Sequence, residues 1–287
     1  MPSPSSDSKP SAFSIAPGTA IGALLNRPPI DAVDARILVC HGLALTRVQL
    51  ITQSDRVLDH EEAARLTVLF RRRIGGEPIA YITGEREFFG LALRTTPDVL
   101  IPRPETELLV ELALERLPSN GRVLDLGTGT GAIAIAIAHT RPDVEVTALD
   151  ASTAALEIAR GNAQRHGCAV RFLHSDWYAA LRDGVRHDLV VSNPPYIVAH
   201  DPHLSQGDLR FEPVDALTDH ADGLSALRSI VRDAPSHLQP HGWLLMEHGY
   251  DQARAVRALL AERGFESVQS WRDLAGIERV SGGRLPG

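Results

Sequence analysis

The sequence is short of cysteine, of lysine and of long apolar runs. Its 287 residues contain two cysteines, Cys40 and Cys168, which lie far apart and outside any C-x-x-C pattern, so neither a disulfide framework nor a zinc site is indicated. No apolar run approaches the roughly 18 residues that a membrane-spanning helix requires. The polar N-terminus has no apolar segment of the kind found in signal peptides. We therefore expect a cytoplasmic protein with no bound metal and no membrane contact.

Basic residues are fewer than acidic residues, and only one of them, Lys9, is a lysine. The counts are 29 and 36, which give a net charge of −7. Proteins that bind nucleic acid broadly usually carry a basic surface, so this balance argues against such a partner. The hydrophobic share of 44% and the charged share of 23% are ordinary for a globular protein. At this length we expect two domains, and by default a monomer.

Changes in composition divide the chain into four segments. Residues 1–17 are rich in serine and proline and are expected to form a disordered extension. Residues 18–76 have a helical pattern, with Asp59 as the expected N-cap of a helix that ends at a pair of glycines. Residues 77–103 contain short apolar stretches separated by glycine and proline, which predict a β-hairpin linker. From residue 104 to 287, strand and helix patterns alternate. This alternation predicts an α/β domain with a doubly wound, mostly parallel sheet and helices on both faces.

A glycine-rich loop follows the first strand expected in the large domain. The run from Val123 to Leu126 leads into Gly127-Thr128-Gly129-Thr130-Gly131 and then directly into a helix. Glycine permits close approach of the backbone, and a helix N-terminus offers unpaired N–H groups, so the loop is typical of a site for a nucleotide-like cofactor. Its G-x-G-x-G spacing differs from the G-x-G-x-x-G of dinucleotide dehydrogenases. A tight turn without a ligand is the alternative, and Asp125 is expected to support the loop.

Two further residues at strand ends are candidates for the same cofactor site. Asp150 ends the next expected strand, about 20 residues further on, where a carboxylate can accept both ribose hydroxyls of an adenosine ligand. The alternative for Asp150 is an N-cap of the helix that starts near Thr153. Trp177 follows the third strand and can stack on an adenine, with a purely buried tryptophan as the alternative.

Asn193-Pro194-Pro195-Tyr196 follows the apolar run that ends at Ser192. Two prolines fix the backbone and remove two N–H donors, so their carbonyl groups stay available. The Asn193 oxygen and a proline carbonyl can accept both hydrogens of an –NH2 group while the Tyr196 ring covers its face. A strand terminator is the alternative. The polar segment Asp201–Pro213 then reads as a solvated loop over the site, although it contains His203 and Glu212.

These motifs resemble those of the release-factor glutamine methyltransferases (the PrmC/HemK family), a class I family that uses S-adenosyl-L-methionine. The resemblance covers nearly everything from about residue 20 to the end. Besides the two motifs above, it rests on Glu77-Pro-Ile-Ala-Tyr-Ile-Thr-Gly84, Glu87-Phe-Phe-Gly90, Leu100-Ile-Pro-Arg-Pro-Glu-Thr-Glu107 and Asp222-Gly-Leu224. Glu247-His-Gly249 departs from the expected Glu-Ile-Gly. Because that position follows a late strand, we expect the chemistry to be unaffected.

The resemblance implies transfer of a methyl group from S-adenosyl-L-methionine to the side-chain amide nitrogen of the glutamine in the Gly-Gly-Gln loop of class 1 peptide chain release factors. It implies that the helical domain binds the substrate protein and that no nucleic acid is required. The implied catalytic residues are Asn193, Pro194 and Tyr196, within a substrate cradle of Asn193, Pro194, Pro195 and Tyr196. The implied cofactor-binding residues are Gly127, Thr128, Gly129, Thr130, Gly131, Asp150, Trp177 and Asn193.

Three other functions are compatible with part of the pattern. A nucleic-acid methyltransferase acting on adenine N6 or guanine N2 shares the Asn-Pro-Pro-Tyr cradle, but the negative net charge and the lack of a basic, aromatic-rich module argue against it. An interaction protein that has lost its chemistry is disfavoured by the intact glycines, Asp150 and Asn193. A dehydrogenase is the weakest alternative, because the glycine spacing differs and the cradle has no role in it.

Overall fold

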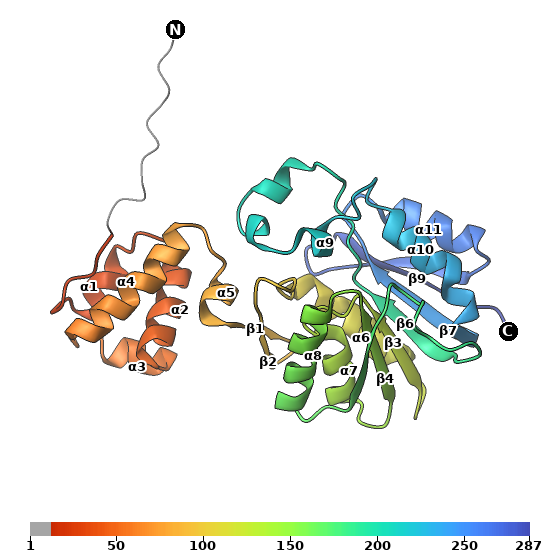
Figure 1. Ribbon diagram of the computed structural model, residues 1–287, viewed down its shortest axis with the longest axis horizontal. Helices are drawn as coiled ribbons and strands as arrows, with labels where there is room; N and C mark the ends of the chain where they lie inside the picture. Colours follow the sequence, from red (N-terminus) through yellow and green to blue (C-terminus); the bar gives the residue numbers. More distant parts are fainter. Residues whose placement is uncertain (1–12) are drawn as a thin grey trace, which may run out of the picture. The chain divides into compact units, whose positions relative to one another are not determined.

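The computed structural model of the chain describes residues 13–287, which divide into two compact units at Gly84 and Glu85 (Figure 1). Residues 1–12 of the expected extension lie outside the described residues. The rest of that extension, residues 13–17, does not fit the prediction of disorder, because the Phe13 ring stacks on Phe70 with centroids 5.7 Å apart. The buried Ile15 donates its N–H to Thr67 Oγ1 at 3.0 Å. The packed chain therefore begins before Pro17. Within residues 13–287, no helix is both long enough and apolar enough to span a membrane.

The first unit is helical, as predicted. Asp59 caps α4 by accepting the Glu62 N–H at 2.8 Å. The apolar faces of the helices meet in one core that contains the fully buried Leu66 and Phe70. The helices are α1 (Ile21–Asn26), α2 (Ala32–Leu43), α3 (Arg47–Thr52), α4 (His60–Ile74) and α5 (Ile79–Thr83).

The segment expected to be a hairpin linker has a different organisation. Its first part is helical, because Tyr81 and Ile82 are buried residues of α5 and their β-propensity is overridden by packing. The hairpin itself consists of β1 (Glu85–Phe88) and β2 (Leu91–Arg94) and belongs to the second unit. Asn162 of α8 (Thr153–Arg165) accepts the Arg94 N–H at 2.7 Å and donates to the Arg94 carbonyl at 3.1 Å. The hairpin is thus anchored to the large domain.

The second unit contains a seven-stranded sheet in the order β5-β4-β3-β6-β7-β9-β8. Neighbouring strands are parallel except for β9, which runs antiparallel to both β7 and β8. The mostly parallel, doubly wound sheet predicted from the sequence is therefore confirmed. The strands are β3 (Arg122–Leu126), β4 (Glu145–Asp150), β5 (Val170–His174), β6 (His187–Ser192), β7 (Leu238–Glu247), β8 (Glu266–Arg272) and β9 (Glu278–Arg284).

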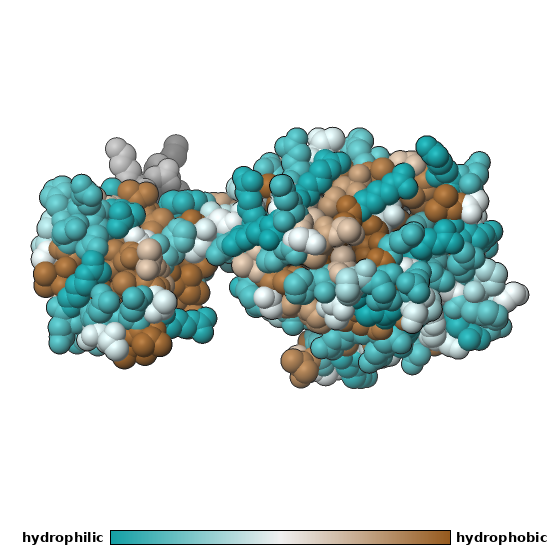
Figure 2. Space-filling model, turned by 90° about the horizontal axis from the view of Figure 1, so that it is seen from below, coloured by the Kyte–Doolittle hydropathy of each residue, from teal (hydrophilic) through white to brown (hydrophobic). Residues whose placement is uncertain are grey.

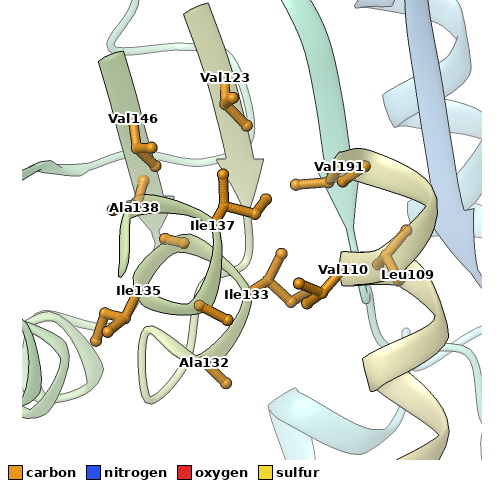
Figure 3. Close-up of a cluster of buried hydrophobic side chains, with 14 of the residues drawn as sticks. Leu109, Val110, Val123, Ala132, Ile133, Ile135, Ile137, Ala138, Val146 and Val191 are labelled. Atoms are coloured by element: carbon orange, nitrogen blue, oxygen red, sulfur yellow. The ribbon is translucent and has the colours of Figure 1, made fainter. Parts of the chain in front are cut away.

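Helices cover both faces of this sheet (Figure 1). Helix α7 packs on the sheet and is flanked by the neighbouring helices of the same face, so its isoleucines and alanines are all buried (Figure 3). The major helices on the first face are α6 (Glu107–Arg116), α7 (Ala132–Thr140) and α8, and those on the second face are α10 (Ser225–Asp233) and α11 (Ala253–Glu262). Shorter elements are the 3-10 turns η1 (Pro104–Thr106), η2 (Pro202–Ser205), η3 (Leu209–Phe211) and η4 (Ala234–Ser236), and the one-turn helix α9 (Val214–Leu217).

The order of the strands reverses between β3 and β6, which pair in parallel at the centre of the sheet. Leu126 and Ser192, the last residues of these strands, are register partners, and the Ser192 hydroxyl donates to the Leu126 carbonyl at 2.7 Å. Open α/β sheets bind ligands at the carboxyl edge beside such a reversal. The topology therefore brings the glycine loop and the Asn193-Pro-Pro-Tyr196 segment together at this edge.

Candidate active site

A cavity of about 370 Å³ lies at the carboxyl ends of the central strands. Six residues singled out in the sequence line it: Gly127, Gly129, Asp150, Trp177, Asn193 and Pro195. Sequence reasoning missed other parts of its wall, among them Asp98 and Val99 after the hairpin and Asp215 and Ala216 of α9. These segments carry no ligand-binding pattern of their own, so only the fold identifies them.

The three glycines of the loop have different roles. All of them have positive φ angles, namely 70° at Gly127, 54° at Gly129 and 83° at Gly131, which side chains other than glycine rarely adopt. A Cβ atom on Gly129 would meet no atom within 4 Å, whereas one on Gly131 would lie 2.7 Å from Ile135 Cδ1. Gly129 therefore leaves bare backbone beside the cavity, and Gly131 permits close packing of the loop against α7.

Asp150 is held by two backbone groups. Its carboxylate accepts the N–H of Gly129 and the N–H of Ser152, each at 2.8 Å. Burial raises the pKa of Asp150 and these N–H groups lower it. Ser152, and not Asp150, caps α8 by accepting the Ala155 N–H at 3.2 Å. A carboxylate has about four acceptor positions, so Asp150 retains capacity for further donors.

The threonines of the loop face the protein interior. The Thr128 hydroxyl donates to Asp125 Oδ2 at 2.6 Å, and both residues are buried. Burial raises the pKa of Asp125 to about 7, against the lowering effect of this hydrogen bond. Thr130 is also buried, and its carbonyl accepts from Asn162 Nδ2 at 2.9 Å. Asp125 thus supports the loop as expected, and neither threonine lines the 370 Å³ cavity.

A second, smaller cavity of about 70 Å³ lies beside the first, and its lining includes Pro194 and Tyr196. Asn193, Leu100 and Ala216 line both cavities. The Asn193 Nδ2 donates to Thr106 Oγ1 at 3.2 Å. Because Nδ2 faces Thr106, the Asn193 Oδ1 faces away from it. A group bound in the small cavity is therefore next to a ligand in the large one, with Asn193 between them.

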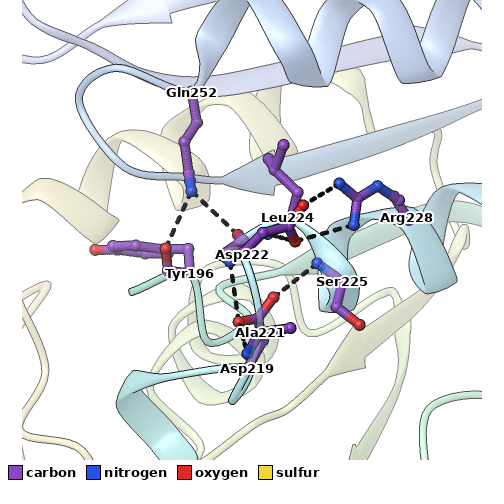
Figure 4. Close-up of polar contacts among 9 residues, drawn as sticks. Tyr196, Asp219, Ala221, Asp222, Leu224, Ser225, Arg228 and Gln252 are labelled. Atoms are coloured by element: carbon purple, nitrogen blue, oxygen red, sulfur yellow. Dashed lines mark hydrogen bonds and ion pairs between the residues drawn. The ribbon is translucent and has the colours of Figure 1, made fainter. Parts of the chain in front are cut away.

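The backbone of Tyr196 is fixed by Gln252, which precedes α11 (Figure 4). Gln252 Nε2 donates to the Tyr196 carbonyl at 3.0 Å and to the Gly223 carbonyl at 3.1 Å. A Cβ atom on Gly223 would lie 2.6 Å from the Tyr196 carbonyl oxygen, so glycine is required there. Asp219 accepts three backbone N–H groups of the same turn, from Ala221, Gly223 and Ser225. The Asp222-Gly-Leu224 motif thus supports the cradle from behind.

The expectation of a solvated loop over residues 201–213 is wrong for Glu212. Its side chain is fully buried, accepts the Ile101 N–H at 3.0 Å and forms an ion pair with Arg103. A buried carboxylate is costly without such partners, so the Ile101 N–H and the Arg103 guanidinium explain why Glu212 can be buried. His203 fits the expectation, because it is exposed and contacts Asp201 at 2.7 Å. The ion pair joins the Ile-Pro-Arg-Pro segment to the loop that precedes α9.

Residues 13–287 contain no group of three histidine, cysteine or acidic side chains that could hold a metal ion. The site consists of two adjacent cavities, the glycine loop, the Asp150 carboxylate at the end of β4, and the cradle stiffened by its two prolines. This arrangement can position a cosubstrate and an acceptor group side by side.

Two family models match the chain. The model described as "Methyltransferase small domain" covers residues 104–207, and the model described as "PrmC N-terminal domain" covers residues 20–84. The first contains the glycine loop, Asp150 and the cradle. The second coincides closely with the helical unit.

Curated relatives match over almost the whole chain. A release factor glutamine methyltransferase from Burkholderia pseudomallei is 58% identical over 279 residues, with 94% of this chain and 98% of the relative covered. The corresponding protein from Bordetella pertussis is 54% identical over 269 residues, covering 93% and 100%. That from Neisseria gonorrhoeae is 52% identical over 256 residues, covering 89% and 94%.

Solved structures support the fold of the large unit. A methyltransferase from Pyrococcus furiosus has a TM-score of 0.54 at 19% identity and covers 77% of this chain and 96% of its own. The 16S rRNA N2 G1207 methyltransferase of T. thermophilus, in complex with AdoMet and guanosine, has a TM-score of 0.54 at 23% identity, covering 70% and 49%. At these identities the likeness shows a shared methyltransferase fold alone.

Proposed function

The chain belongs to the release factor glutamine methyltransferases, and on that premise we propose that it methylates the side-chain amide nitrogen of the glutamine in the Gly-Gly-Gln motif of class 1 peptide chain release factors. The methyl donor in this proposal is S-adenosyl-L-methionine. The observation that carries the proposal is the position of Asn193, which forms a wall of both the 370 Å³ cavity and the 70 Å³ cavity. A donor in the first and an amide in the second would be in contact across it.

The larger cavity fits an adenosine-containing cosubstrate in size and in chemistry. Its volume of about 370 Å³ is within the range of small-molecule sites, about 300–1,000 Å³. The bare backbone at Gly129 admits a ligand close to the loop, and Asp150 has acceptor capacity for ribose hydroxyls. Trp177 offers an aromatic face for the base. When bound, S-adenosyl-L-methionine supplies an activated methyl group.

The cradle residues hold the acceptor. The Asn193 Oδ1 and the Pro194 carbonyl accept the two hydrogens of the glutamine amide, and the Tyr196 ring packs on the amide plane and excludes water. Accepting both N–H groups raises the electron density on a nitrogen that is a weak nucleophile. These hydrogen bonds accelerate the reaction to the extent that they strengthen as positive charge develops on that nitrogen.

Orientation supplies most of the rate enhancement in this mechanism. Holding two reactants in line can contribute about 7–11 kcal/mol to lowering the barrier. A general base is not required, because the proton can leave after the methyl group has been transferred. The rigid backbone of Pro194 and Pro195, with Tyr196 fixed by Gln252 at 3.0 Å, supports an in-line placement that varies little.

The helical unit is proposed to bind the substrate protein. Its α1, α2 and α3 surround a largely apolar groove of about 1010 Å³ that includes Val33, Ile37 and Ile51. Val48 and Ile51 are 69% and 75% exposed, and brown apolar patches reach the surface of this unit in Figure 2. Exposed apolar surface of this kind is typical of protein-binding faces. We propose that the protein acts as a monomer and requires no nucleic acid. We also propose a cytoplasmic location, because release factors act on ribosomes.

Labelling with methyl-labelled S-adenosyl-L-methionine tests the proposal. The protein is incubated with a purified release factor, and in parallel with tRNA, rRNA and DNA. We expect label on the release factor and none on nucleic acid. Label on nucleic acid alone, on adenine N6 or guanine N2, would refute the glutamine assignment while leaving the methyltransferase class intact.

A further inference from the structure

Arg103 lies at the wall of the small cavity and is not used by the mechanism above. Of the described residues that line this cavity, it is the only one with a charged side chain, and the others are apolar or belong to the cradle. Its side chain is 30% exposed, so a bound molecule can reach it. The Ile-Pro-Arg-Pro-Glu-Thr-Glu motif that contains Arg103 therefore contributes a charged group to the acceptor side of the site.

Two prolines and a buried carboxylate hold Arg103 in place. A residue that precedes a proline is restricted to extended backbone, and Arg103, followed by Pro104, has φ −98° and ψ 141°. The fully buried Glu212 accepts from Arg103 Nη2 with Oε1 and from the Ile101 N–H with Oε2. The arginine is thus positioned before a substrate arrives, which reduces the entropy lost on binding.

Most of the hydrogen-bonding capacity of Arg103 is unused. A guanidinium group has five N–H donors, and among residues 13–287 only Glu212 accepts from this one. The pair with Glu212 adds no net charge beside the positively charged sulfonium of the methyl donor. Because Glu212 already neutralises the guanidinium, its remaining N–H groups fit neutral oxygen acceptors better than they fit an anion.

The size of the small cavity decides which part of a substrate meets Arg103. Its volume of about 70 Å³ is roughly that of two water molecules, at about 30 Å³ each. It therefore admits the end of a glutamine side chain and leaves the main chain of the acceptor loop at its mouth. The glutamine amide oxygen is an unsuitable partner for Arg103, because a hydrogen bond donated to it would withdraw electron density from the nitrogen that is methylated.

We propose that Arg103 is a substrate-binding residue: held by Glu212 at the wall of the small cavity, its guanidinium donates to main-chain carbonyl groups of the acceptor loop beside the glutamine. The inference rests on the proposed function, which supplies the Gly-Gly-Gln motif. Glycines have no side chains to be recognised, so their main-chain groups are the only hydrogen-bonding partners that they offer. A planar fork of donors fits such a row of carbonyl groups.

Three variants of the full chain test the proposal. Arg103→Lys keeps a positive charge against Glu212 but replaces the planar fork with one ammonium group. Arg103→Met combined with Glu212→Gln removes both charges and leaves no buried carboxylate unpaired. Arg141→Lys is the matched control, because Arg141 also pairs with a carboxylate, Asp143 at 2.6 Å, and lines neither cavity. The readouts are kcat, KM for the release factor, Kd for S-adenosyl-L-methionine, and the melting temperature.

For both changes at Arg103, we expect KM for the release factor to rise about tenfold or more, as for loss of hydrogen bonds to a charged group. The kcat at saturating release factor and the Kd for the methyl donor should change little, because the lost contacts are made equally in the ground state and the transition state. Arg141→Lys should match the wild type in all readouts. An unchanged KM in Arg103→Lys, or a KM that rises only together with a lower melting temperature and a lower kcat, would overturn the proposal.

The NMR signal of the Arg103 Nε–H group identifies the part of the substrate that it contacts. The signal is assigned by its absence from the spectrum of Arg103→Lys. We expect it to shift when a release factor is added, including a factor in which alanine replaces the glutamine of the motif, because the main-chain carbonyl groups are the same in both. No shift, or a shift only with the intact glutamine, would overturn the proposal.

The labelling experiment separates failure of this inference from failure of the proposed function. Label on nucleic acid alone would refute the proposed function and this inference with it. A glutamine that is methylated by Arg103→Lys with the wild-type KM would refute this inference alone.

Discussion

The backbone N–H of Gly129 donates to the carboxylate of Asp150 at 2.8 Å and so joins the first and second strand-to-helix turns of the sheet. This contact places the expected ribose-binding group directly against the glycine loop. The loop and the carboxylate therefore act as one unit, and loss of either should impair the same binding event.

Asp150→Asn should weaken binding of S-adenosyl-L-methionine by about 10- to 100-fold, because hydrogen bonds from ribose hydroxyls to a charged group are worth about 1.5–3 kcal/mol. Isothermal titration calorimetry measures the Kd. Asp143→Asn, at an exposed carboxylate that pairs with Arg141 at 2.6 Å and does not line the cavity, is the control and should change the Kd little. An Asp150→Asn protein with wild-type affinity would exclude Asp150 from ribose binding.

Alanine substitutions at two glycines of one loop should separate binding from stability. Gly129→Ala adds a methyl group beside the cavity, so we expect a large loss of affinity for the methyl donor. Because the backbone at Gly129 is left-handed, the free energy of unfolding should also fall by about 1–2 kcal/mol. Gly131→Ala adds contacts at 2.7 Å to Ile135 and 3.2 Å to Ala159, so we expect destabilisation of about 2–4 kcal/mol. Thermal melts and titrations of both variants provide the comparison. Equal stability losses would contradict the distinct roles assigned to these glycines.

Gly161→Ala should stabilise the protein by about 0.5–1 kcal/mol. Gly161 is exposed in the interior of α8, and an added Cβ would meet no atom within 4 Å. Alanine restricts the unfolded chain and has the higher helix propensity, so the free energy of unfolding rises. Urea denaturation measures the change, and methyl transfer should remain at the wild-type level. A decrease in stability would mean that the helix surface at this position is not as open as described.

Thr128→Val should destabilise the protein more at pH 8 than at pH 4. The pKa of Asp125 is about 7 in the folded protein, above its ordinary value of 3.8, so the ionised form is the costly one. The stability contributed by this group is present at low pH and is lost as the pH rises through about 7. Removing the Thr128 hydroxyl leaves the ionised carboxylate without that donor, at a cost of about 1.5–3 kcal/mol at high pH and about 1 kcal/mol at low pH.

Denaturation curves of Thr128→Val and Thr128→Ser at both pH values test this expectation. The serine variant retains the hydroxyl and should follow the wild type. If the loss in Thr128→Val is the same at pH 4 and pH 8, the Asp125 carboxyl group does not ionise in the range given by its raised pKa.

Local patterns were sufficient to predict the main parts of the fold and the edge of the sheet at which the glycine loop and the Asn-Pro-Pro-Tyr segment meet. The three glycines and the Asn-Pro-Pro-Tyr segment each follow an apolar strand, and parallel strands bring their carboxyl ends to one edge. The pairing of Leu126 with Ser192 in the sheet register confirms that the two strands end at the same edge. The prediction for Asp59 also held, because a helix cap depends only on neighbours within one turn.

Contacts between distant residues could not be predicted from one sequence. Thr106 and Asn193 are 87 positions apart, and Arg103 and Glu212 are 109 apart. Nothing in the local pattern around Glu212 distinguishes a buried, paired carboxylate from a solvated one. At Tyr81 and Ile82 the local preference for strand was misleading, since burial within a helical core outweighs intrinsic propensity.

The most direct test of the proposed function is the position of the transferred methyl group within a release factor. After reaction with S-adenosyl-L-methionine, the factor is digested and its Gly-Gly-Gln peptide is fragmented by mass spectrometry, with Asn193→Ala, shown by titration to retain cofactor binding, as the comparison. We predict a single methyl group on the side-chain nitrogen of that glutamine with the wild-type protein, and almost none with Asn193→Ala. Methylation of another residue, or equal methylation by Asn193→Ala, would contradict the account.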